Sequence, residues 1–217
     1  MKNNSRNFNA AVAVVPHSMA LPTPSWTAGL PTLAGQLVAI RDLRVSDAPT
    51  LLGMLGSDEV GRFISSPPAT ADEFERFIIG THRLRAEGRC LCFAIVPHGL
   101  DEPVGVIQIR QLDPTFETAE WGFAIGSAFW ATGVFLDAAR LALRFAFETL
   151  GVHRLEARAT VTNGRGNGVL RKLGAIHEGV LRRSLLREGE YVDQALWTIL
   201  AEEWRMAQSD PLLSRIH

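Results

Sequence analysis

The sequence predicts a mixed α/β fold of the α+β class, in which a β-sheet carries helices on both faces. From residue 37 onward the patterning reads strand, two helices, three strands, helix, strand, helix and two strands. The chain has 217 residues, 47% of them hydrophobic, which is enough for one domain with a sizeable core. The formal net charge of −1 lacks the Lys/Arg excess of a nucleic-acid-binding surface. We therefore expect a globular protein without a nucleic-acid partner.

Residues 1–34 are expected to form an irregular N-terminal arm. A short apolar patch near its start is below the length of a secretory signal, and the stretch LPTPSWTAGLP is rich in proline. An arm docked through Trp26 and Leu30 and a disordered tail are both open alternatives. We assign residues 35–206 to the domain and residues 207–217 to a C-terminal tail. No apolar run is long enough to span a bilayer, so no membrane partner is expected.

The first strand is predicted at LVAIRDL, and the polar pair Ser46 and Asp47 then opens an amphipathic helix. A second helix begins at Thr70, because Glu73 stands three residues later as in a capping box. Gly88 ends this helix. Its expected buried stripe consists of Phe74, Phe77 and Ile78.

The middle of the chain is rich in strands. CLCFAIV and VGVIQIRQL flank the turn HGLDEP and predict a hairpin, and ETAEWGFAIG predicts the next strand. Cys90 and Cys92 alternate on the first of these strands and share one face. Two adjacent thiols without a second Cys or His cluster favour packing, so we expect no metal site. Free cysteines also fit a reducing compartment, which predicts a cytoplasmic location.

The second half of the chain predicts a long helix over LDAARLALRFAFETLG with a stop at Gly151. HRLEARATV predicts a strand, and GRGNGVLRKLG a short helix that ends at Gly174. AIHEGVLRRSLL and YVDQALWTILAEEW predict two final strands around the turn REGE. Trp121 and Trp197 are expected in the core.

Two strand-to-helix junctions offer backbone N–H groups that could hold a phosphate. One is the turn from Trp130 to Phe135, before the long helix, and the other is the run Gly164, Gly166, Gly168. The spacing G-x-G-x-G matches neither the Rossmann nor the Walker pattern. On local grounds these glycines favour a tight turn over a phosphate site.

Several ordered blocks together resemble the GNAT superfamily of acyl-CoA-dependent N-acyltransferases, and within it the branch of ribosomal-protein N-terminal acetyltransferases. The blocks are AEWGFAIG, FWATGVFLDAARLALRFAFETLGVHRLEA, TNGRGNGVLRKLGAIHEGVLRRS and GEYVDQALWTILAEEW, between about Leu33 and Trp204. The resemblance implies a mostly antiparallel, splayed sheet of about six to seven strands. It also implies acetyl-CoA as cosubstrate, lying between two central strands that part like a V.

The resemblance implies a specific set of cofactor-binding residues. The pantetheine arm pairs with strand backbone, the pyrophosphate lies on the turn before the long helix, and an asparagine assists the pantetheine. In this sequence these are Phe123, Ala124, Ile125, Trp130, Thr132, Gly133, Val134, Phe135 and Asn163. Trp130 replaces the usual Gln or Arg of the turn, and the bulky Phe135 is expected to narrow the approach.

Three side chains are candidates for catalysis. Glu120, on the strand beside the thioester, is the candidate general base, with an exposed surface carboxylate as the alternative. Asp193 is a second candidate carboxylate, with a hydrogen bond to a turn as its alternative. Tyr191 either donates to the leaving thiolate or packs. The usual acids of relatives are absent, because Gly166 stands in place of Ser and Leu170 in place of Tyr.

Other polar residues carry weaker hypotheses. His153 and His177 are candidate proton-transfer groups but are expected to pack or lie on the surface. Glu178 is expected to hold structure. Arg182 and Arg183 either bind an acidic substrate or a CoA phosphate, or are solvated.

The resulting functional hypothesis is an N-acetyltransferase that moves an acetyl group from acetyl-CoA to a primary amine by direct attack in a ternary complex. No Cys–His or Ser–His–Asp signature points to a covalent intermediate. The amine is a protein N-terminus or a small molecule. The oligomeric state stays open, with a homodimer as one alternative. The alternative is a non-catalytic acyl-CoA-binding module on the same fold, suggested by the two missing acids.

Overall fold

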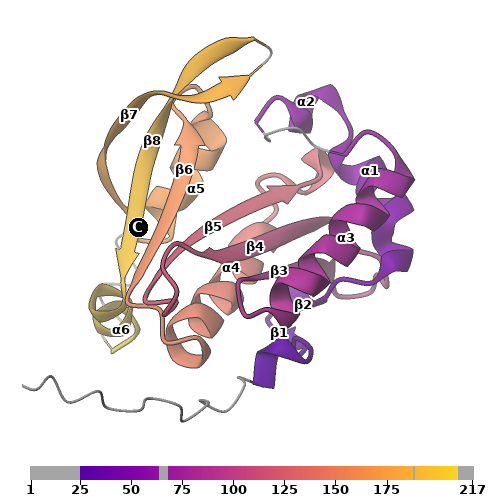
Figure 1. The fold of residues 1–217 in the computed structure, drawn as a ribbon, viewed down its shortest axis with the longest axis horizontal. Coiled ribbons are helices and arrows are strands. Elements are labelled where there is room, and N and C mark those ends of the chain that lie inside the picture. Colours follow the sequence, from indigo (N-terminus) through magenta and orange to yellow (C-terminus); the bar gives the residue numbers. More distant parts are fainter. Residues whose placement is uncertain (1–24, 64–67, 188, 210–217) are drawn as a thin grey trace, which may run out of the picture.

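The computed structural model describes residues 25–63, 68–187 and 189–209. It contains one eight-stranded sheet in the order β1-β2-β3-β4-β5-β6-β8-β7 (Figure 1). Every neighbouring pair is antiparallel except β5 and β6, which run parallel. The predicted mixed α/β fold with a mostly antiparallel sheet is therefore confirmed.

The bounds of the elements are as follows. The strands are β1 (Leu33–Ala34), β2 (Val38–Asp42), β3 (Cys90–Pro97), β4 (Gly105–Gln111), β5 (Thr118–Ile125), β6 (Arg154–Thr160), β7 (Ile176–Arg187) and β8 (Glu190–Leu200). The α-helices are α1 (Ala48–Leu55), α2 (Asp58–Gly61), α3 (Ala71–Ala86), α4 (Val134–Arg144), α5 (Gly164–Lys172) and α6 (Ala201–Ser209). Short 3₁₀ turns occur at Ser25–Thr27, Val45–Asp47 and Ser127–Phe129, and a π-helical turn, Phe145–Thr149, continues α4.

The sheet has one strand more than the six to seven that were expected. The additional strand, β1, is only two residues long and pairs with β2. The turn between them is held by Asp137 of α4, whose Oδ2 accepts the N–H groups of Leu37 at 2.7 Å and Val38 at 3.2 Å. This contact joins residues about a hundred positions apart, so local patterning did not predict it.

Helices cover both faces of the sheet and enclose two cores. α1 and α3 pack on one face of the central strands, with α4 on the other face (Figure 1). The larger core lies under α4 and contains Trp121 and Trp197, which are 2% and 5% exposed as predicted. The smaller core contains Cys92, together with Phe74 and Ile78 of the predicted stripe on α3, while Phe77 is only partly buried.

The ends of α3 also follow the prediction. Thr70 Oγ1 accepts the N–H of Glu73 at 3.2 Å, and the Glu73 carboxylate accepts the N–H of Ala69 at 2.7 Å. The helix is followed by Gly88 at φ 71°. At the start of α1, by contrast, Asp47 makes no cap to the helix and instead forms a bidentate pair with buried Arg41.

One expectation about secondary structure was wrong. The predicted last strand stops at Leu200, because the following acidic residues begin α6 and Glu203 Oε2 accepts the Leu200 N–H at 3.0 Å. The short helix predicted over GRGNGVLRKLG is found as α5, and its glycines, for which a tight turn was favoured on local grounds, lie in the first turns of that helix. None of its three glycines has a positive φ, and the left-handed position is Gly174, after the helix.

The described part of the N-terminal arm docks on the domain. Trp26 is 7% exposed, and its ring meets the ring of Phe116 edge-on at 5.7 Å. Leu30 packs against the same core. Residues 1–24 of the arm and 210–217 of the tail lie outside the described residues. In the part of the chain that the structure describes, no helix has the length and hydropathy needed to cross a membrane.

Candidate cofactor and acceptor site

The sheet opens between its two parallel strands. β5 pairs with β6 only from Thr118–Arg154 to Glu120–Glu156. Beyond that point β5 continues beside β4 as far as Ile125, and β6 continues beside β8 as far as Thr160. The strands are close at one end and far apart at the other (Figure 1). This is the V that the resemblance implied, with its vertex at Glu120 and Glu156.

Backbone polar groups of β5 line one side of this V. The N–H of Gly126 donates to Val104 on the β4 side at 2.9 Å, so even-numbered residues of β5 direct their backbone groups toward β4. Ala124 is one of these residues. Phe123 and Ile125 instead direct their N–H and C=O groups toward the gap, where the carbonyl of Ile125 accepts the Trp130 Nε1–H at 3.1 Å. Of the three predicted backbone contacts, only those of Phe123 and the N–H of Ile125 are therefore available there.

The turn before α4 forms a concave set of N–H groups. Ala131 has φ 59° and Gly133 has φ 87°, and Thr132 between them does not have a positive φ. Alternation of this kind points successive N–H groups toward one spot and creates an anion-binding nest. Thr132 Oγ1 donates to the carbonyl of Phe129 at 2.7 Å and accepts the N–H of Val134 at 3.4 Å. The nest lies at the positive end of an 11-residue helix.

Phe135 does not narrow this turn, contrary to the expectation from its size. Its side chain is 8% exposed, and its ring lies 4.4 Å from the ring of Phe123. Position 135 is in the first turn of α4, and its side chain points into the core rather than across the nest. The Phe135 side chain therefore packs against β5.

Asn163 ends the opposite side of the V and caps α5. Its Oδ1 accepts the N–H of Gly166 at 2.9 Å. A Cβ on Gly166 would lie 2.6 Å from Asn163 Nδ2, so the cap in this form requires glycine. Asn163 Nδ2 has no acceptor among the described residues.

Asn167 is a positioning residue that sequence reasoning missed. Its Nδ2 donates to the carbonyl of Thr160 at 3.0 Å, and its Oδ1 accepts from Trp197 Nε1 at 2.8 Å. It thus fastens α5 to the end of β6 and to β8. Its Nδ2 also donates to the carbonyl of Asn163 at 2.8 Å. The contacts with Thr160 and Trp197 join it to β6 and β8, and no local signal predicts them.

Glu120 lies at the vertex, on the face of the sheet that carries α1 and α3. Its carboxylate accepts a hydrogen bond from the guanidinium of Arg110, and its side chain is 16% exposed. Two residues further along the same face, Gly122 is exposed, and a Cβ there would have no atom within 4 Å. Glu120 therefore borders open space on a central strand, as a base that meets an incoming substrate requires.

A second carboxylate stands beside it. Glu156 is the register partner of Glu120 and shares its face of the sheet. Arg154 Nε lies 2.9 Å from one Glu156 oxygen, and Arg158 lies 3.7 Å from the other. Sequence reasoning missed Glu156, because its position depends on the short parallel pairing of β5 with β6.

The structure does not bring Asp193 and Tyr191 to Glu120. Thr198 of β8 is the register partner of Glu156, which is itself paired with Glu120. Asp193 and Tyr191 lie five and seven residues from Thr198 along β8. These offsets correspond to about 17 and 23 Å along a strand. Asp193 Oδ1 accepts the N–H of Arg183 at 2.7 Å, and Tyr191 is 63% exposed.

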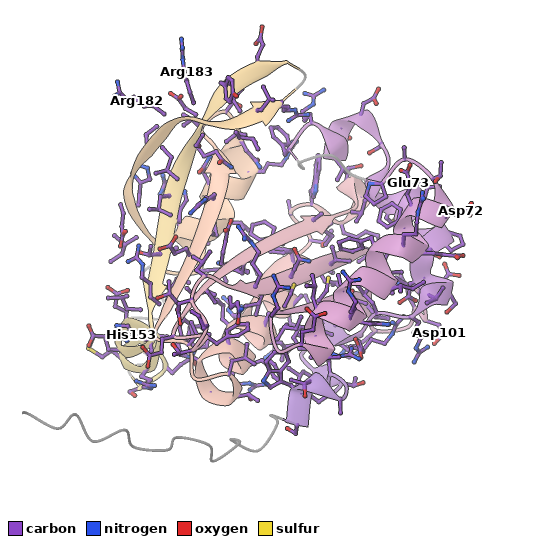
Figure 2. All side chains as sticks on the ribbon, in the orientation of Figure 1. Asp72, Glu73, Asp101, His153, Arg182 and Arg183 are labelled. Atoms are coloured by element: carbon purple, nitrogen blue, oxygen red, sulfur yellow. The ribbon has the colours of Figure 1, made fainter. Side chains whose placement is uncertain are left out.

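The remaining polar candidates have structural contacts. Glu178 accepts two hydrogen bonds from Arg154, at 2.7 and 2.6 Å, and one from Thr198 at 2.8 Å. These bonds, the arginine first, lower the pKa of Glu178 to about 2. His177 packs on the ring of Trp197 at 5.1 Å. His153 is exposed at the start of β6 (Figure 2).

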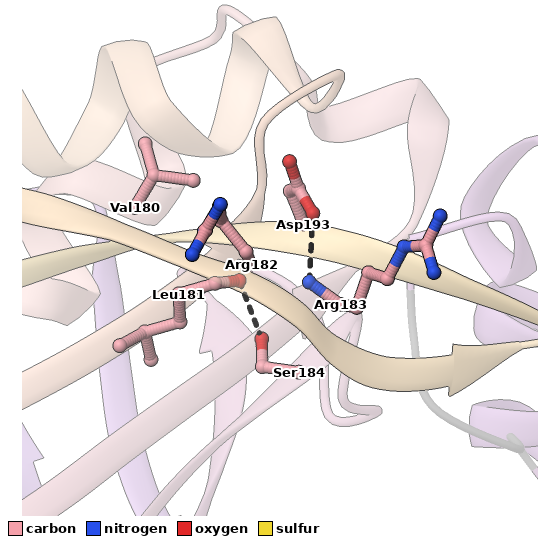
Figure 3. A pocket seen from close by; sticks show the side chains of 6 residues that line it. All are labelled: Val180, Leu181, Arg182, Arg183, Ser184 and Asp193. Carbon is pink, nitrogen blue, oxygen red and sulfur yellow. Dashed lines mark hydrogen bonds between the residues drawn. The ribbon is translucent and has the colours of Figure 1, made fainter.

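Arg182 and Arg183 line an open pocket on the β7–β8 hairpin, with a volume of about 880 Å³ (Figure 3). A bulge in β7 creates it: Arg183 has φ 51°, and Ser184 Oγ donates to the carbonyl of Leu181 at 3.0 Å. Both arginines are exposed and point outward from the hairpin (Figure 2). They do not face the vertex of the V.

The two cysteines are free and buried. Burial raises the pKa of Cys90 to about 11, and it also raises the pKa of Cys92 well above its usual value. Both thiols are therefore protonated at neutral pH, and they pack under the helices that cover β3. Neither supplies a nucleophile to the site.

Comparison with known proteins identifies the family of this chain. The family model described as acetyltransferase (GNAT) domain matches residues 38–176. The chain belongs to the GNAT acetyltransferase family. Among its relatives, the uncharacterized N-acetyltransferase p20 of Bacillus licheniformis is 25% identical over 80% of this chain and 98% of its own. The ribosomal protein uS5-alanine N-acetyltransferase of Escherichia coli is 25% identical over 54% of this chain and 61% of its own.

Solved structures agree with this GNAT assignment at the level of the fold. RimJ of Mycobacterium smegmatis, solved in complex with CoA-disulfide, superposes with a TM-score of 0.72 at 24% identity, covering 83% of this chain and 90% of its own. The predicted family, fold and enzyme class, an acyl-CoA-dependent N-acetyltransferase, are thereby confirmed. GNAT enzymes use acetyl-CoA as cosubstrate.

The groups present in this GNAT domain fit acetyl-CoA chemically. The nest at Ala131–Gly133 offers N–H donors for a pyrophosphate. Phe123 offers a backbone donor and acceptor for an amide-containing arm. Asn163 Nδ2 is a further donor across the gap.

Proposed function

We propose that this GNAT enzyme acetylates the α-amino group of a protein N-terminus, using acetyl-CoA bound in the V between β5 and β6. The observation that carries the proposal is the arrangement of the V itself, with an anion nest at its open end and a carboxylate at its vertex. The choice of a protein N-terminus is supported by the relative from Escherichia coli whose name specifies a ribosomal protein alanine.

Binding of the cosubstrate uses backbone groups in this proposal. The pyrophosphate accepts N–H groups of Ala131, Thr132, Gly133 and Val134, and the dipole of α4 adds about 0.3–2 kcal/mol for each such contact. The pantetheine arm pairs with the backbone of Phe123 and the N–H of Ile125. Asn163 donates from the opposite side. Backbone donors tolerate a change of side chain, so the replacement of Gln or Arg by Trp130 does not remove them.

Glu120 is the general base of the proposed reaction. The amine nitrogen attacks the thioester carbonyl and its proton passes to Glu120; the tetrahedral intermediate then expels the CoA thiolate, which water reprotonates. Glu156 is less suited to this role, because Arg154 and Arg158 both hold its carboxylate. Glu120 has one charged partner, Arg110, whose side chain is 51% exposed.

Turnover with a panel of amines tests this proposal. The purified protein is mixed with acetyl-CoA and either short peptides with free N-termini or small amines, and the release of free thiol is followed. We expect turnover with peptides and loss of turnover when the peptide N-terminus is blocked. Tight binding of CoA without turnover on any amine would instead favour the non-catalytic module.

A further inference from the structure

One contact joins the two sides of the V at its open end. The guanidinium carbon of Arg165 lies 4.2 Å from the centre of the Trp130 ring. Trp130 follows β5, whereas Arg165 lies in the first turn of α5, after β6. Because β5 and β6 have parted at this level, the stacked pair crosses the gap between them.

The indole of this pair is fixed beside the phosphate nest. Trp130 Nε1 donates to the carbonyl of Ile125 at 3.1 Å, which sets the plane of the ring. Ala131, the first residue of the nest, follows directly. The arginine that stacks on the ring is therefore held next to the N–H groups proposed to bind pyrophosphate.

The charge of Arg165 is not neutralised by the protein. Its side chain is exposed, and it forms no ion pair with any carboxylate within residues 25–63, 68–187 and 189–209. Arg110 and Arg154 of the same site are both paired. A planar guanidinium that rests on an aromatic ring keeps its N–H edges free and is suited to bidentate contact with a phosphate.

We propose that Arg165 is a binding residue for the pyrophosphate of acetyl-CoA and that its stack on Trp130 is a clasp across the cofactor groove. Entry of the pantetheine arm parts the stack, and Arg165 exchanges the indole for the phosphate. The sequence has no cation at position 130, so the charge at this mouth comes from α5 on the other side. The inference rests on the proposed function, because it assumes that acetyl-CoA lies in the V.

The test compares donors with and without phosphates in wild type, Arg165→Ala, Arg165→Lys and the control Arg171→Ala. Arg171 lies on the same helix, and its guanidinium carbon is 5.6 Å from the centre of the Trp197 ring. It makes no ion pair with a described carboxylate. We expect Arg165→Ala to raise the Kd for acetyl-CoA about 10- to 100-fold, the range of a charge-assisted hydrogen bond, with kcat at saturating donor unchanged. Arg165→Lys retains charge and recovers part of the loss, and Arg171→Ala changes nothing.

The donors identify the phosphate that Arg165 contacts. The loss should persist with acetyl-dephospho-CoA, which keeps the pyrophosphate, and vanish with S-acetyl-pantetheine, which lacks it. Equal Kd values for wild type and Arg165→Ala would overturn the proposal, and so would a loss confined to donors that carry the 3′-phosphate. Wild type that neither binds acetyl-CoA nor turns over would refute the proposed function instead, so the two failures are distinguishable.

A spectroscopic readout tests the clasp separately from affinity. If acetyl-CoA parts the stack, it changes the environment of Trp130 and therefore the intrinsic fluorescence. We expect most of this change to disappear in Trp130→Phe and to persist in Trp26→Phe, whose indole is buried against Phe116 away from the V. An unchanged fluorescence response in Trp130→Phe would contradict the opening of the clasp.

Discussion

Replacement of Glu120 by Gln is the perturbation that bears most directly on catalysis. The amide has nearly the same shape and still offers an oxygen to Arg110, but it cannot accept the proton of the attacking amine. The proposed role of Glu120 therefore predicts a fall in turnover with the site geometry retained.

The Glu120→Gln substitution has two effects, the loss of the general base and the loss of the ion pair with Arg110. Loss of a positioned general base lowers the rate about 10²- to 10⁴-fold, or roughly 3–5 kcal/mol in the barrier. The structural cost is far smaller. Arg110 is 51% exposed, so its ion pair with Glu120 contributes at most about 1 kcal/mol to stability. A large loss of rate in a folded variant is thus expected.

The assay is thiol release with acetyl-CoA and a peptide acceptor, together with thermal unfolding and the Kd for acetyl-CoA. Glu117→Gln is the matched control, because Glu117 precedes β5 and its side chain is exposed. We expect Glu120→Gln to retain its Tm within a few degrees and its Kd, while kcat falls at least about 100-fold. A kcat within about threefold of wild type would refute Glu120 as the base.

Three further predictions concern the frame around the site. Glu178→Gln should lower the free energy of unfolding at pH 7 by about 1 kcal/mol. Because folding lowers the pKa of Glu178 from 4.5 to about 2, this difference from wild type should shrink as the pH drops through that window. A difference that does not change with pH in acid titrations would contradict this. Asp47→Asn leaves the buried guanidinium of Arg41 unpaired and should cost about 3–5 kcal/mol in denaturant unfolding; a loss below about 1 kcal/mol would show that the pair is not needed. Gly122→Leu fills the open space beside Glu120 and should raise the KM for the peptide acceptor about tenfold or more with the Tm retained, whereas unaltered acceptor kinetics would place the acceptor elsewhere.

Sequence patterning predicts the elements whose signals are local. The cap at Thr70, the stop at Gly88 and the hairpin of β3 and β4 depend on neighbouring residues and are found as expected. Patterning is less decisive where the same residues suit two structures. It predicts the helix over GRGNGVLRKLG but also allows a tight turn at its opening glycines, and in the structure Asn163 caps the helix by accepting the N–H of Gly166.

The candidate site also has some parts that the sequence predicts and others that it does not. Its backbone parts, the nest before α4 and the gap-facing Phe123, follow from the order of the elements. Glu156 enters the vertex through a parallel pairing of only three residues, which alternation along one strand does not encode. Tyr191 is distant because β8 extends well past the end of β6. Long-range register, rather than residue type, decides which polar groups meet.

Amide hydrogen exchange with and without acetyl-CoA tests the central claim, that the cosubstrate lies in the V between β5 and β6. Binding there covers the N–H groups of Phe123 and Ile125 and the nest at Ala131–Val134, which have no strand partners on that side. We predict that acetyl-CoA slows exchange in residues 121–135 and 160–167 and leaves the β3–β4 hairpin unchanged. Slowed exchange confined to the β7–β8 pocket, with no effect in residues 121–135, would contradict the account.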